Sequence, residues 1–168
     1  GFFYYGTSYG NIKSPSLQIE HVIEDIEKLN KRAINHELDI TAISAHAYAF
    51  IKDYVILNSG GSFGIKYGPI VISKKNIELK QLHKYKIGIP GKMTSANLLL
   101  NMAIGNFNGV EIIFNEIPKH VSSGLVDAGI IIHEAQISLA DEFKKILDLG
   151  GWWHDLTNGM PVPLGINV

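Results

Sequence analysis

Ile87-Gly88-Ile89-Pro90-Gly91-Lys92-Met93-Thr94-Ser95-Ala96 and Ile40-Thr41-Ala42-Ile43-Ser44-Ala45 are the two stretches that decide the fold class. In each, a short apolar run typical of a buried strand is followed by Ser or Thr, residues that often cap a helix N-terminus. Residues 40–43 and 86–89 are therefore predicted strands, and residues 45–51 and 95–104 are predicted helices. Strands that alternate with helices in this way indicate an α/β protein with mostly parallel strands.

The same alternation continues along the rest of the chain. Further strands are predicted at residues 17–23, 54–57, 69–73, 110–114, 128–132, 146–149 and from 164 onward. Further helices are predicted from the Asp25 cap through Asn35, at 117–123, at 139–145 and around Trp152-Trp153. The glycines within residues 59–64 predict a loop.

A polar break at residues 74–76 predicts a boundary between two lobes. We expect residues 1–73 to form part of a first lobe and residues 74–163 to form a second. Residues 164–168 are expected to be a strand that returns to the first lobe.

The composition excludes several classes of function. The chain has 168 residues, of which 46% are hydrophobic and 18% charged, and this is enough apolar material for a core. Fifteen basic and sixteen acidic residues give a net charge of −1, so a nucleic-acid partner is not expected. The absence of cysteine excludes disulfides, thiolate metal sites and a cysteine nucleophile. No apolar run has the length of a membrane span, and no signal peptide is evident, so a soluble, unexported protein with no membrane partner is expected.

Hydroxyl residues at the two strand-to-helix junctions are candidate ligand contacts. Ligands of open α/β sheets bind beyond the carboxyl ends of the strands, where helix N-termini attract anions. Ser44, Thr94 and Ser95 stand at these places, and two such lobes facing one another would form a cleft suited to a carboxylate. The simpler alternative is that these residues only cap their helices.

His133 is the candidate catalytic residue. It follows the buried strand predicted at residues 128–132, so this strand would deliver it to the edge of the cleft. The pKa of a histidine lies near 6.5, which suits proton transfer at neutral pH. A surface or structural histidine is the alternative, and a zinc site is disfavoured because no second histidine lies at ligand spacing.

Two glycine-containing segments do not match nucleotide-binding motifs. Gly91-Lys92 is followed by Met93 instead of Ser or Thr, so the segment is not a phosphate-binding P-loop. Residues 60–68 lack the strand, glycine motif and helix order of a dinucleotide site.

Several stretches together resemble one family, the 1,4-dihydroxy-6-naphthoate synthases of the futalosine route to menaquinone. They are Glu24-Asp25-Ile26-Glu27 with Leu29-Asn30, Asp39-Ile40-Thr41-Ala42-Ile43-Ser44-Ala45-His46-Ala47-Tyr48, Gly68-Pro69-Ile70-Val71, Pro90-Gly91-Lys92-Met93-Thr94-Ser95-Ala96-Asn97-Leu98-Leu99, Asp127-Ala128-Gly129-Ile130-Ile131-Ile132-His133-Glu134, Asp148-Leu149-Gly150-Gly151-Trp152-Trp153 and Pro161-Val162-Pro163-Leu164-Gly165. The resemblance covers nearly the whole chain in order.

This resemblance implies a fold like that of the type 2 periplasmic binding proteins, with two α/β lobes around a central cleft. It implies a cytoplasmic enzyme that fragments cyclic dehypoxanthine futalosine to 1,4-dihydroxy-6-naphthoate without a redox cofactor or a metal. Carried over by position, His133 corresponds to the proton acceptor of the family. The substrate-contacting segments correspond to Ala42, Ile43 and Ser44, and to Thr94, Ser95 and Ala96. The family also has an opening strand before the aromatic residues at which this chain starts, and it continues past the strand near Leu164.

Two alternatives share the expected architecture. Chorismate dehydratase belongs to the same pathway and fold, but it leaves the segment Ile132-His133-Glu134 without a role. A non-catalytic binding protein for a small carboxylate would bind in the same cleft without turnover.

Overall fold

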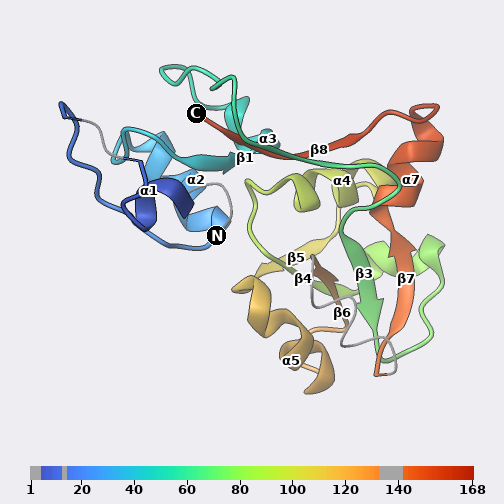
Figure 1. Ribbon diagram of the computed structural model, residues 1–168. Helices are drawn as coiled ribbons and strands as arrows, with labels where there is room; N and C mark the ends of the chain where they lie inside the picture. Colours follow the sequence, from blue (N-terminus) through green and yellow to red (C-terminus); the bar gives the residue numbers. More distant parts are fainter. Residues whose placement is uncertain (1–4, 13–14, 133–141) are drawn as a thin grey trace.

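Two β-sheets stand one above the other in the protein, as Figure 1 shows. The structure is a computed structural model that describes residues 5–12, 15–132 and 142–168. The smaller sheet has the strand order β1-β8-β2, and the larger has the order β5-β4-β6-β3-β7. In the described residues, no helix combines the length and apolar character that a membrane span requires.

The smaller sheet is antiparallel and is organised around the last strand of the chain. It consists of β1 (Ala42–Ser44), β8 (Val162–Asn167) and β2 (Gly61–Gly64). β8 lies between the other two strands, with Ile166 opposite both Ile43 of β1 and Gly61 of β2. The sheet therefore depends on pairing between segments that are far apart in the sequence.

The larger sheet mixes parallel and antiparallel pairs. It consists of β5 (Asn108–Glu111), β4 (Lys86–Ile89), β6 (Ala128–Ile131), β3 (Ile70–Ser73) and β7 (Lys144–Asp148). β4 is parallel to β5 and β6, whereas β3 is antiparallel to β6 and β7. The expected α/β class with mixed sheets is therefore confirmed, but the strands are not mostly parallel, because two of the six pairings among the described residues are parallel. β3 enters this sheet from the smaller one and runs opposite to β4 and β6.

The described residues also form helices, most of which pack against the sheets or between them. They are α1 (Tyr5–Ser8), α2 (Ile26–Ile34), α3 (Ala45–Tyr48), α4 (Ser95–Ile104), α5 (Ile117–Ser122) and α7 (Leu149–Leu156), with 3-10 segments η2 (Leu79–Lys84) and η3 (Phe114–Glu116). α2 starts as predicted, because Asp25 Oδ1 accepts a hydrogen bond from the Lys28 N–H at 3.0 Å. α4 has the predicted bounds and lies between the two sheets in Figure 1.

The buried apolar residues form three clusters, two centred on the larger sheet and one beside the smaller sheet. Ile87 of β4, Leu100 of α4 and Leu149 of α7 belong to the main cluster of the larger sheet. Ile43 of β1 and Ala33 of α2 are fully buried in a separate cluster beside the smaller sheet. The cluster beside the smaller sheet is separate from the two clusters of the larger sheet, as expected for a chain built as two lobes.

Several predicted elements differ from the structure. Residues 17–23 and 54–57 form no strand, and residues 61–64, predicted as part of a loop, form the edge strand β2. The helix predicted at 139–145 falls partly outside the described residues, and its last two positions begin β7. The lobe division after residue 73 stays a prediction, although β3 already pairs with β6 and β7.

Candidate active site

The turn between β4 and α4 leaves backbone N–H groups at the edge of the larger sheet. Thr94 is the N-cap of α4: its Oγ1 accepts a hydrogen bond from the Asn97 N–H at 3.3 Å and donates one to the Gly91 carbonyl at 2.7 Å. The N–H groups of Ser95 and Ala96 have no acceptor in the part of the chain that the structure describes. Unpaired amides at a helix N-terminus carry the positive end of the helix dipole and can bind an anion.

Ser44 reaches the same region from the end of β1. Ser44 was predicted to cap α3, but its hydroxyl makes no capping hydrogen bond to this helix. Ser44 Oγ instead accepts a hydrogen bond from Asn30 Nδ2 at 3.1 Å, and the Ser44 N–H donates to Asn30 Oδ1 at 2.8 Å. Asn30 belongs to α2, so α2 holds this serine in place and the four-residue helix α3 does not.

Ser95 connects the first turn of α4 to the smaller sheet. Its hydroxyl donates to the Leu164 carbonyl of β8 at 2.9 Å and accepts from the His46 N–H at 3.3 Å. His46 Nδ1 lies 3.2 Å from the Thr94 carbonyl oxygen. A carbonyl can only accept, so this contact requires the tautomer with a proton on Nδ1. These bonds hold α3, α4 and β8 together.

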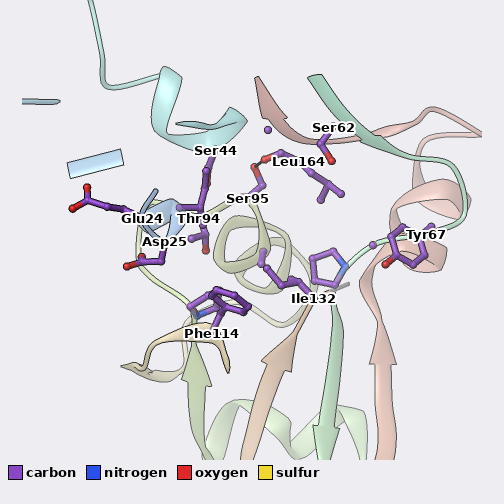
Figure 2. A pocket seen from close by; sticks show the side chains of 16 residues that line it. Glu24, Asp25, Ser44, Ser62, Tyr67, Thr94, Ser95, Phe114, Ile132 and Leu164 are labelled. Atoms are coloured by element: carbon purple, nitrogen blue, oxygen red, sulfur yellow. Dashed lines mark hydrogen bonds between the residues drawn. The ribbon is translucent and has the colours of Figure 1, made fainter. Parts of the chain in front are cut away.

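A cavity of about 280 Å³ lies between the two sheets, where these segments meet (Figure 2). Its lining residues are Glu24, Asp25, Ile26, Ser44, Ser62, Tyr67, Gly68, Pro69, Pro90, Thr94, Ser95, Ala96, Phe114, Ile132, Leu164 and Gly165. The volume is near the lower end of the roughly 300–1,000 Å³ that is common for small-molecule sites. An apolar cavity with a few hydroxyls and free amides is the usual form of such a site.

Charge is unevenly distributed around the cavity. Glu24 and Asp25 line it on the side away from Tyr67 in Figure 2, and none of the described lining residues is a lysine or arginine. Hydrogen bonds from Lys28 and Arg32 lower the pKa of Glu24, so this carboxyl is ionised at neutral pH. The helix N-terminus at Ser95 and Ala96 is therefore an electropositive part of the described wall.

Four of the six predicted contact residues line the cavity. They are Ser44, Thr94, Ser95 and Ala96. Ala42 and Ile43 are not among the lining residues, and Ile43 is fully buried in the core beside β1. Their role as substrate contacts stays a prediction.

His133 lies outside the described residues. Ile132, the residue before it in the sequence, does line the cavity. The assignment of His133 as the proton acceptor therefore stays a prediction.

Several lining residues were not predicted. For those that precede β3, the reason is the direction of this strand. Tyr67, Gly68 and Pro69 lie at the beginning of this strand. A parallel strand would place them at the opposite edge of the sheet, whereas the antiparallel pairing of β3 with β6 brings Ile70 beside Ile131, at the cavity edge.

Close backbone packing fixes this part of the wall. A Cβ atom on Gly68 would come within 2.8 Å of the Gly150 Cα, at the start of α7. Glycine at position 68 therefore lets the segment before β3 lie directly against α7.

The family model described as menaquinone biosynthesis matches residues 1–168. The chain belongs to this family. Two curated relatives are named 1,4-dihydroxy-6-naphthoate synthase. The one from Thermus thermophilus is 37% identical over 166 residues, and the one from Streptomyces coelicolor is 30% identical over 173 residues. Each alignment covers 98% of this chain and 60% of the relative, so the chain spans less than two thirds of their length.

Solved structures confirm the fold class. A crystal structure of an Archaeoglobus fulgidus protein is 47% identical, with a TM-score of 0.90, and covers 99% of this chain and 62% of that one. The alkanesulfonate-binding protein SsuA from Xanthomonas axonopodis is 14% identical, with a TM-score of 0.63, over 84% of this chain and 51% of that one. This second likeness concerns the fold alone, which is the two-lobe fold of the solute-binding proteins.

Proposed function

We propose that the protein to which this chain belongs is a 1,4-dihydroxy-6-naphthoate synthase of menaquinone biosynthesis. The observation that carries the proposal is the pair of curated relatives with this name, which align with 98% of the chain. The cavity between the sheets supports it, because it combines apolar walls with hydroxyls and free amides. We further propose that the enzyme is cytoplasmic.

The reaction we propose is a base-initiated fragmentation of cyclic dehypoxanthine futalosine. His133 accepts a proton from the substrate, and the electrons released expel the sugar-derived carbon fragment while the ring becomes aromatic. The reaction is of the lyase class, and its proton transfer needs a general base with a pKa near neutrality. We propose that it uses no redox cofactor and no metal. The support for His133 is the family resemblance and its place directly after the cavity residue Ile132.

The free amides of Ser95 and Ala96 are the groups we assign to the substrate carboxylate. They belong to the electropositive end of α4, and a carboxylate there would satisfy both N–H groups. Ser44 and the carboxylate of Asp25 can bond hydroxyl groups of the same substrate. Closing the two lobes around it would exclude water and fix the reacting geometry.

The direct test incubates the intact protein with cyclic dehypoxanthine futalosine and follows formation of 1,4-dihydroxy-6-naphthoate by mass spectrometry. We expect product with the wild type and at least a hundredfold slower turnover with His133→Ala, since general bases contribute roughly 10²–10⁴-fold. Consumption of chorismate instead would indicate the dehydratase, and binding without product would indicate a binding protein. An unchanged rate in the variant would refute the role of His133.

A further inference from the structure

Two polar side chains of α2 are buried without lining the cavity. Glu27 is 5% exposed and Asn30 is fully buried, and both face the segments that carry the candidate substrate contacts. A buried carboxylate and a buried amide are costly unless hydrogen bonds satisfy them. Their partners therefore indicate what they contribute.

Asn30 determines the direction of the Ser44 hydroxyl. The Ser44 N–H can only donate, so the Asn30 atom 2.8 Å away must be the oxygen Oδ1, and this fixes the orientation of the amide. Asn30 Nδ2 then donates to Ser44 Oγ at 3.1 Å, so this oxygen is an acceptor in the pair. The Ser44 hydrogen has no acceptor in the described residues, which leaves it free for a ligand in the cavity that Ser44 lines.

Glu27 connects this pair to the turn before α4. Its Oε2 accepts from Asn30 Nδ2 at 3.2 Å and from the Met93 N–H at 3.2 Å. Gly91, at φ +155°, lies against the Glu27 carboxyl, where a Cβ atom would collide with the carboxyl group. One carboxylate thus bridges α2, which packs beside β1, and the turn that leaves β4.

We propose that Asn30 and Glu27 are positioning residues: Asn30 turns the Ser44 hydroxyl toward the cavity as a hydrogen-bond donor, and Glu27 holds Asn30 and the Met93 turn in place. The substrate group that the hydroxyl recognises is then an acceptor, such as a carbonyl, hydroxyl or carboxylate oxygen. The inference uses the proposed function only in taking this cavity as the reaction site.

The decisive variant exchanges the two side-chain types. In Glu27→Gln with Asn30→Asp, the new amide at position 27 can accept from Met93 and donate to the new carboxylate at position 30. That carboxylate accepts from the Ser44 N–H, but it also accepts the Ser44 hydroxyl hydrogen, which is then no longer available to the substrate. The network stays satisfied while two hydrogen bonds reverse direction: the one between residues 30 and 27, and the one between residue 30 and Ser44.

We expect KM for the substrate to rise roughly 10- to 100-fold in this double variant, with kcat within about threefold of wild type. A merely structural role predicts the opposite pattern, because partial unfolding lowers apparent kcat and leaves KM unchanged. Ser44→Ala should raise KM to a similar extent. Combining Glu27→Gln and Asn30→Asp with Ser44→Ala should then have no further effect on KM.

The matched control is Asn35→Asp, the same substitution at the exposed C-cap of the same helix, which should leave KM unchanged. Amide hydrogen exchange gives a readout without substrate: Asn30→Ala should accelerate exchange at Ser44, whereas the double variant should not. Unchanged KM in the double variant, multiplicative effects with Ser44→Ala, or unaltered Ser44 exchange in Asn30→Ala would overturn the proposal. Lack of turnover by the wild type would refute the proposed function, and the amide hydrogen exchange measurement would still test the roles of Asn30 and Glu27.

Discussion

Three of the hydroxyl groups that line the cavity, those of Ser44, Thr94 and Ser95, differ in how their hydrogen atoms are used. Thr94 donates to the Gly91 carbonyl and Ser95 donates to the Leu164 carbonyl, so both hydrogens are used within the protein. Ser44 accepts from Asn30, and its hydrogen has no acceptor among the described residues. The sequence correctly placed all three at the sheet edges, but it could not distinguish them, because their partners lie on other elements.

The pKa of Glu27 gives a prediction at the same scale. Burial raises this pKa above the ordinary value, although bonds from Asn30 and Met93 favour the charged form. The folded state therefore binds the proton more tightly than the unfolded state, and stability falls as the pH rises through the folded pKa. The stability of Glu27→Gln relative to wild type should therefore increase as the pH rises, because the variant carries no titrating group at this position.

Urea unfolding of both proteins between pH 4 and pH 8 measures this difference. Glu37→Gln is the control, since Glu37 is exposed and lies just after the same helix. A stability gain that grows on acidification would contradict the account.

At the scale of elements, local signals were sufficient for some segments and not for others. α4 has the predicted bounds because its cap, its apolar face and the glycine at its end all lie within its own sequence. β2 was missed because residues 61–64 become a strand only by pairing with β8, about a hundred residues later. Strand direction was missed for the same reason: an apolar run indicates a buried strand but not its orientation.

The caps of α4 and α7 allow a comparison between a helix at the cavity and one that does not begin there. Thr94 and Asp148 each accept a hydrogen bond from the first turn of their helix. We expect Thr94→Ala and Asp148→Ala each to cost about 1 kcal/mol of unfolding free energy. Only Thr94→Ala should also raise KM, because it releases the turn that presents the Ser95 and Ala96 amides.

Denaturant unfolding together with steady-state kinetics checks both variants, and Thr94→Ser should restore KM. Equal KM values for the two alanine variants would show that the cap of α4 has no special role in binding.

At the scale of the whole molecule, the cavity exists because β8 returns to the smaller sheet. Leu164 and Gly165 of β8 line the cavity together with Ser44 from β1 and Ile132 from the end of β6. The sequence indicated two lobes, a strand near Leu164 and a cleft between helix N-termini. It did not place Tyr67, Gly68 and Pro69 in the wall, since this required the antiparallel course of β3.

The most direct test of the account is a crystal structure of the intact protein with 1,4-dihydroxy-6-naphthoate bound. We predict the naphthoate between the two sheets, with its carboxylate at the Ser95 and Ala96 amides and a ligand oxygen accepting from the Ser44 hydroxyl. A naphthoate bound outside this cavity, or a Ser44 hydroxyl turned away from it, would contradict the account.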